Sequence, residues 1–138
     1  MNNFFHQGIE ENRFESPDIL YFGSMKMLKS FRDAFNGIGI LIRSERNFQI
    51  HIVAFLIAVG AGFYLQITRG EFITILIVSA LVFSLEAANT AIEKLCDEVT
   101  QERKESIRKI KDVAAGAVLI SAIFALAVGV TIFWKYVF

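Results

Sequence analysis

Three long apolar segments separate this chain from an ordinary soluble domain. They cover residues 48–67, 72–96 and 113–134. Each segment reaches the roughly 20 residues that an α-helix needs to cross about 30 Å of hydrocarbon. Hydrophobic residues make up 54% of the chain, which is more than a soluble domain usually carries. We therefore expect an all-α integral membrane protein with three transmembrane helices.

An amphipathic segment precedes the first apolar segment. Between residues 18 and 43, apolar residues recur at three- and four-residue spacing, as Leu28, Phe31 and Phe35 illustrate. This pattern predicts a helix that lies in the membrane interface, and a soluble amphipathic helix packed on a core is the alternative. Residues 1–17 read as a polar tail, which leaves residues 18–138 as a single membrane domain.

The distribution of charge predicts an orientation. The formal net charge is +0, which argues against a nucleic-acid partner. Basic residues cluster before the first span and in the segment 97–112. Both clusters would lie on the same side of the membrane, and basic residues near span ends favour the cytoplasmic side. Only Arg69 and Lys135 lie on the other side. We expect a cytoplasmic amino terminus and an external carboxyl terminus.

Polar residues inside the second span are the main anomaly. Glu86, Asn89 and Glu93 follow an i, i+3, i+7 spacing and share one helical stripe, which Asp97 continues. A carboxylate at membrane depth is costly unless it is paired or protonated, and such residues usually mark a functional site. Lys94 is two turns from Glu86, too far along the helix to neutralise it. The stripe alone leaves three interpretations open: a cation or catalytic site, a proton relay, or a polar contact between helices.

Two further features lie at the ends of the spans. Glu45 is expected where the amphipathic helix turns into the first span, near the level of Glu93. Two carboxylates from separate helices at one level can share Mg²⁺, and a solvated turn charge is the alternative. Asp112 is expected to begin the third span as an N-cap or first-turn acid. Lys111 either snorkels to the interface or meets a nucleotide phosphate.

Four segments resemble the prokaryotic diacylglycerol kinase family, which includes the undecaprenol kinases of Gram-positive bacteria. They are SFRDAFNG at 30–37, ERNFQIH at 45–51, EAANTAIE at 86–93 and KDVAAGAV at 111–118. The Glu-x-x-Asn-x-x-x-Glu stripe followed by Lys-Asp-x-x-Ala is specific at this spacing. The resemblance covers the chain from about Lys26 to its end, and the ERNFQIH form is closer to the undecaprenol kinase branch.

This resemblance implies a homotrimer with composite active sites, Mg-ATP as the donor and a lipid alcohol, diacylglycerol or undecaprenol, as the acceptor. It implies that Glu86 takes the hydroxyl proton and that Asn89 orients the reacting groups. The other implied roles are metal binding by Glu45 and Glu93, phosphate binding by Lys111 beside Asp112, nucleotide phosphate binding by Lys26 and Lys29, and nucleoside binding by Asp97.

The same resemblance places the protein in a bacterial inner membrane, with its active site on the cytoplasmic side. One departure from the family is the missing histidine in the segment between the second and third spans, where Lys104 lies near that position. Nucleotide recognition is therefore expected to differ. A small oligomeric ion or proton channel and a non-catalytic assembly subunit are the alternatives. A channel needs the buried acid but has no use for Glu45, Lys111 and Asp112 at the rim.

Overall fold

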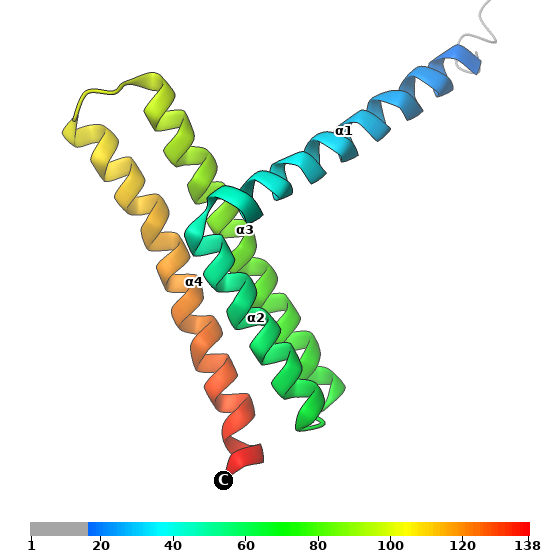
Figure 1. Cartoon of the computed structure of the whole chain (residues 1–138), viewed down its shortest axis with the longest axis vertical. Coiled ribbons are helices and arrows are strands. Elements are labelled where there is room, and N and C mark those ends of the chain that lie inside the picture. The colour runs from blue at the N-terminus through cyan, green and yellow to red at the C-terminus, as the bar shows by residue number, and fades with distance from the viewer. Residues whose placement is uncertain (1–16) are drawn as a thin grey trace, which may run out of the picture. The chain divides into compact units, whose positions relative to one another are not determined.

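The computed structural model describes residues 17–138, with side chains from Lys26 onward. Figure 1 shows the helices of this part of the chain: α1 (Pro17–Ser44), α2 (Arg46–Tyr64), α3 (Arg69–Val99) and α4 (Glu105–Val137). By length and composition, α2, α3 and α4 are each able to cross a membrane. The predicted all-α class and the three candidate spans are therefore confirmed. Of the predicted polar tail, residues 1–16 lie outside the described residues.

The chain divides after Gly39 into two compact units. Within the first unit, α1 is a continuous helix in which the apolar residues Leu28, Phe31 and Phe35 are exposed. The helix spans almost the residues that the apolar periodicity predicts. Its placement in the membrane interface stays a prediction.

In the second unit, α3 is the central helix and packs against both α2 and α4 (Figure 1). Ile75 and Val82 of α3 are buried. Phe83 of α3 contacts two phenylalanines of α2, with ring centroids 5.4 Å from Phe48 and 5.6 Å from Phe55. Most other large apolar side chains of the three helices remain exposed. Apolar surface of this extent is typical of contact with lipid or with other subunits.

A tight connection joins α2 to α3. Gln66 adopts a positive φ of 52°, and Thr68 then begins α3 with a capping box. The Thr68 hydroxyl accepts a hydrogen bond from the Glu71 amide, and the Glu71 carboxylate accepts one from the Thr68 amide. The two helices form the antiparallel pair that the sequence predicts, although the connection begins at residue 65 and not near residue 68.

The charged segment between the second and third spans is mostly helical, which corrects the prediction of a long connection over residues 97–112. The helix α3 continues to Val99 and α4 begins at Glu105. Charge does not stop a helix once it has left the hydrocarbon, and oppositely charged neighbours three or four residues apart support it. The apolar pattern records only the part of each helix that faces hydrocarbon, so it underestimates the length of both helices.

The predicted role of Asp112 as an N-cap or first-turn acid is wrong for the same reason. Lys104 occupies the N-cap position of α4, without a side-chain cap. Asp112 lies two turns further on, where its carboxylate accepts a hydrogen bond of 2.8 Å from Arg108. This pair follows the i, i+4 spacing.

Candidate functional site

The polar stripe predicted on the second span lies on α3 and faces the inside of the bundle. Glu86 is 3% exposed, and Asn89 and Thr90 are each 5% exposed. Sequence reasoning missed Thr90, because a threonine between Asn89 and Ala91 gives no signal of burial. We call the end of the bundle that holds Glu45, Glu93 and Asp97 the site end. The opposite end, with Thr68, Glu71 and Tyr136, is the far end.

Glu86 has one basic and two acidic neighbours. The charges of Glu45, Glu93 and His51 act on its carboxylate, and the Asn47 side chain is its hydrogen-bonding neighbour. Among residues 26–138, no lysine, arginine or histidine lies within ion-pair distance of Glu86. A buried carboxylate without a cation is costly, so the arrangement matches an acid that is kept for function.

Asn89 is held in one orientation and leaves one oxygen free. Its Nδ2 donates a hydrogen bond of 3.0 Å to Glu93 Oε1. Its Oδ1 is buried and has no hydrogen-bond partner within the part of the chain that the structure describes. A buried acceptor without a partner costs about 1–3 kcal/mol. In a native protein such an atom is often completed by an ion, a water or a ligand.

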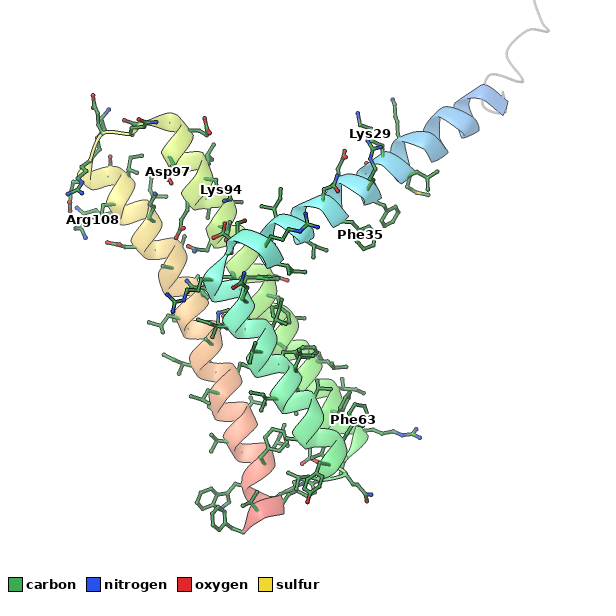
Figure 2. All side chains as sticks on the ribbon, in the orientation of Figure 1. Lys29, Phe35, Phe63, Lys94, Asp97 and Arg108 are labelled. Atoms are coloured by element: carbon green, nitrogen blue, oxygen red, sulfur yellow. The ribbon has the colours of Figure 1, made fainter. Side chains whose placement is uncertain are left out.

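Glu45 and Glu93 lie at the same end of the bundle, as the sequence predicts. Glu45 is the extended residue at the N-cap of α2, and its Oε1 lies 2.8 Å from the Nζ of Lys94. Lys94, labelled on α3 in Figure 2, directly follows Glu93 in the chain, so its contact with Glu45 places the two acids at the same end of the bundle. Sequence reasoning missed the pair, because 49 residues separate its members and no local pattern connects them.

The donor set fits a divalent cation that is shared with a nucleotide. Residues 26–138 contain no group of three or more His, Cys, Asp or Glu side chains that could hold a metal ion by themselves. They do offer the carboxylates of Glu45 and Glu93, together with the free Oδ1 of Asn89. Mg²⁺ usually takes one or two protein carboxylates and completes its shell with water and substrate phosphates.

A second group of charges lies where α3 and α4 approach their connection. The Lys111 ammonium is 2.5 Å from Asp97 Oδ1. Arg108 binds Asp112 and Glu105, each at 2.8 Å. A polar cavity of about 450 Å³ is lined by these helices and their connection, including Asp97, Arg108 and Lys111. Sequence reasoning did not single out Arg108.

The structure thus brings Lys111 and Asp97 together and places Asp112 on the Arg108 side of the same helix. The exposed Lys26 and Lys29 lie on α1, in the other unit of the chain.

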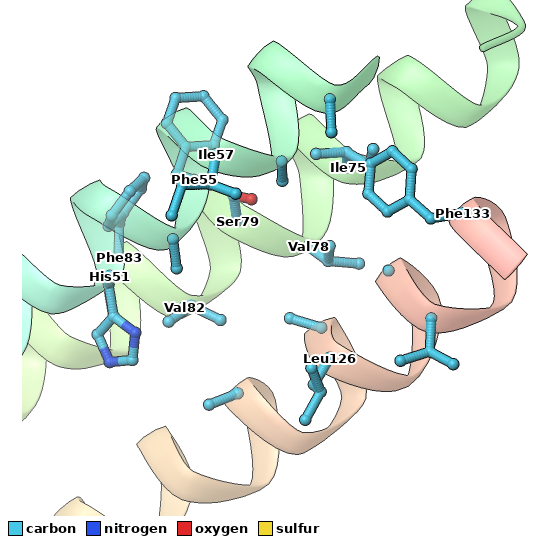
Figure 3. Close-up of a pocket in the computed structure, with 17 residues that line it drawn as sticks. His51, Phe55, Ile57, Ile75, Val78, Ser79, Val82, Phe83, Leu126 and Phe133 are labelled. Carbon is cyan, nitrogen blue, oxygen red and sulfur yellow. The ribbon is translucent and has the colours of Figure 1, made fainter. Parts of the chain in front are cut away.

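An apolar cavity of about 440 Å³ lies between α2, α3 and α4 (Figure 3). Its walls combine small residues such as Ala58 and Ala125 with larger ones such as Phe55 and Phe133. His51, whose charge acts on Glu86, lines one end of the cavity. The lining is almost entirely apolar, which suits an aliphatic chain.

Comparison with known proteins gives a consistent result. The family model described as prokaryotic diacylglycerol kinase matches residues 32–133. The chain is 37% identical over 108 residues to the undecaprenol kinase of Bacillus subtilis (strain 168), which covers 78% of this chain and 88% of that protein. It is 36% identical over 104 residues to the diacylglycerol kinase of Synechocystis sp., covering 75% of this chain and 59% of that protein.

A more distant relative is the diacylglycerol kinase of Escherichia coli (strain K12). It is 26% identical over 114 residues, which cover 83% of this chain and 93% of that protein. The match to the family model includes every predicted site residue except Lys26 and Lys29.

Proposed function

The chain belongs to the prokaryotic diacylglycerol kinase family, whose members are lipid kinases, and from this we propose that it transfers the γ-phosphoryl group of Mg-ATP to the hydroxyl of a membrane lipid alcohol. The observation that carries the proposal is the environment of Glu86. This carboxylate is buried and has acidic neighbours but no ion-pair partner among the described residues. Such an acid is available to accept a proton.

Glu86 acts as the general base. The hydroxyl oxygen of the lipid forms a bond to the γ-phosphorus, the bond from that phosphorus to the bridging oxygen breaks, and ADP leaves. The hydroxyl proton passes to Glu86. Asn89, fixed by its hydrogen bond to Glu93, presents its free Oδ1 to the reacting groups and orients them. In phosphoryl transfer, the protein contributes mainly such positioning and charge stabilisation.

Glu45 and Glu93 would hold Mg²⁺, which when bound supplies positive charge to the phosphate oxygens. This role fits their common level at the site end. It also fits the incomplete protein shell, because the nucleotide supplies the remaining oxygen ligands. The carboxylates themselves keep the cation beside Glu86.

The nucleotide approaches from the connection between α3 and α4. Lys111 would bind the phosphate being transferred, and its ammonium is already held in the site by Asp97. Asp112 follows Lys111 in the chain, and Asp97 would contact the nucleoside. Binding of the other phosphates by Lys26 and Lys29 stays a prediction of the family resemblance. The polar cavity of about 450 Å³ is large enough to take part of the nucleotide.

The lipid approaches from the hydrocarbon. Its chain lies in the apolar cavity between α2, α3 and α4, and its hydroxyl points past His51 toward Glu86. Diacylglycerol and undecaprenol both present a hydroxyl beside long apolar chains, and relatives carry both names. The active site and the amino terminus face the cytoplasm of a bacterial cell, because the basic residues gather at the site end.

Three copies assemble into a trimer with active sites at the subunit interfaces. The exposed apolar surface of α2–α4 supports further contacts within the membrane. Co-expression of Glu86→Gln and Lys111→Met subunits tests this arrangement. Some interfaces of a mixed trimer combine an intact Glu86 with an intact Lys111, so part of the activity returns. No recovery in mixed trimers that cross-linking has verified contradicts composite sites.

The direct test of function uses the purified full chain in mixed micelles with γ-labelled ATP. Diacylglycerol and undecaprenol are offered separately, each with Mg²⁺ and with excess chelator. We expect label in at least one lipid with Mg²⁺ and none with chelator. The ratio of the two turnover rates identifies the acceptor. A folded, oligomeric protein that labels neither lipid would contradict the proposal.

A further inference from the structure

Within residues 26–138, Lys94 is the one cation that forms an ion pair with Glu45, Glu86 or Glu93. Its Nζ lies 2.8 Å from Glu45 Oε1, whereas the acids Glu86 and Glu93 form no ion pair in that part of the chain. The ammonium therefore balances one of three carboxylates that act on each other.

The two sides of this ion pair are unequally accessible. The Glu45 side chain is 23% exposed and the Lys94 side chain is 56% exposed. The carboxylate is fixed by its position between α1 and α2, but the lysine reaches it with a long flexible stem from the solvent side. Such a pair contributes little to stability, and the ammonium can leave the carboxylate without any change in the helices.

The Lys94 ammonium binds the same Glu45 oxygen that the expected cation would bind. Glu45 Oε1 accepts the Lys94 hydrogen bond, and the free, buried Oδ1 of Asn89 belongs to the same cluster through Glu93. A divalent cation that binds Glu45 must share or displace this ammonium, because two positive charges on one carboxylate repel each other.

We propose that Lys94 is an exchangeable counter-ion of Glu45, which occupies this carboxylate until a divalent cation displaces it. The inference rests on the proposed function for the identity of Glu45 as a metal ligand. Lys94 then lowers the affinity of the site for the free cation. When no divalent cation is bound, its positive charge reduces the repulsion among the three carboxylates. Lys94 is a positioning residue, since it acts through Glu45.

The direction of the change in cation affinity on removal of Lys94 distinguishes competition from a structural role. If Lys94 only holds Glu45 in place, its removal weakens cation binding. If it competes with the cation, its removal strengthens binding. Exposed ion pairs of this kind correspond to roughly a two- to five-fold change in an equilibrium constant.

The test is a titration of the purified full chain with Mn²⁺ at a fixed concentration of a non-hydrolysable ATP analogue. The electron paramagnetic resonance signal of free Mn²⁺ follows binding, and a protein-free titration of the analogue corrects for its own Mn²⁺ binding. We expect Lys94→Met to lower the Kd about two- to five-fold and Lys94→Arg to leave it near the unmodified value. Lys109→Met is the matched control, because Lys109 pairs with Glu105 on α4. It removes the same charge away from Glu45 and leaves the Kd unchanged.

A second readout follows Lys94 directly in the unmodified protein. Acetylation of lysines with a water-soluble reagent, measured by mass spectrometry, is expected to increase at Lys94 when Mn²⁺ is added and to stay constant at Lys109. The inference is overturned by a Kd that rises or stays constant in Lys94→Met, by an equal effect of Lys109→Met, by unchanged labelling of Lys94, or by absence of Mn²⁺ binding. Neither readout needs turnover, so a failed lipid assay and a failed exchange are distinguishable.

Discussion

Two glutamates on the same helix have opposite environments. At the far end, Glu71 accepts hydrogen bonds from the Thr68 amide at 2.9 Å, the Thr68 hydroxyl at 2.7 Å and the Tyr136 hydroxyl at 2.7 Å. Its other oxygen pairs with Lys135. At the site end, Glu86 is more deeply buried, has no ion-pair partner among residues 26–138, and lies near the charges of His51, Glu93 and Glu45.

The contrast teaches how to separate a structural acid from a functional one in a membrane helix. Glu71 is paired with every kind of donor that a carboxylate can use, so its position is explained by the contacts it makes. Glu86 has the Asn47 side chain as a hydrogen-bonding neighbour and no ion-pair partner among residues 26–138, so a bound ligand is the better explanation of its position. The same difference extends to the neighbours of the two acids, and it predicts three matched pairs of variants.

The largest difference is expected between Glu86→Gln and Glu71→Gln. Loss of a general base typically costs 10²–10⁴ in rate, so Glu86→Gln should lower kcat by about 10³-fold while the oligomeric state and Tm stay unchanged. Glu71→Gln should lower Tm by a few degrees, because Lys135 loses its partner, and should leave kcat within about two-fold. The measurements are labelled-phosphate transfer and thermal unfolding in detergent. Equal losses of activity in both variants would remove the distinction.

A smaller difference is expected between two lysines that each pair with an acid at 2.5 Å. Lys111→Met should lower kcat about 10²-fold, since it removes a charge that stabilises the transferred phosphate. Its stability should change little, because its partner Asp97 is 68% exposed. Lys135→Met should lower stability and leave kcat unchanged, because its partner Glu71 is only 18% exposed. Labelled-phosphate transfer and thermal unfolding again measure the two effects. A Lys111→Met protein with normal kcat would contradict the phosphate role.

The smallest difference is expected between Asn89→Leu and Tyr136→Phe. Asn89→Leu removes an unpartnered oxygen of a side chain of similar size, so stability should hold or increase, while loss of orientation lowers kcat about ten-fold. Tyr136→Phe removes one hydrogen bond to Glu71 and should lower Tm slightly, with normal kcat. An Asn89→Leu protein that unfolds more easily and keeps its kcat would show that Asn89 is structural.

The sequence predicts the architecture well because membrane constraints are local. Three apolar segments are enough to define α2, α3 and α4, and the stripe of Glu86, Asn89 and Glu93 follows from helical spacing alone. The ends of the helices are predicted less well. Thr100 and Lys104 mark the true connection, but the charged residues around them are equally compatible with a helix or a loop.

The pairing of residues across the bundle is beyond sequence reasoning. Lys94 with Glu45 and Tyr136 with Glu71 are separated by 49 and 65 residues. Their contacts depend on how α2 and α4 pack on α3, which no single helix encodes. The free oxygen of Asn89 is likewise visible only once Glu93 is seen to hold the amide nitrogen.

The network at Glu71 also has a geometric consequence for the reaction. An α-helix rises 1.5 Å per residue, so Glu86 lies about 22 Å along α3 from Glu71 without a break in the helix. In the proposed orientation, the Glu71 network anchors the outer end of α3. Because the helix between the two acids is continuous, that anchor then determines the depth of Glu86 in the bilayer.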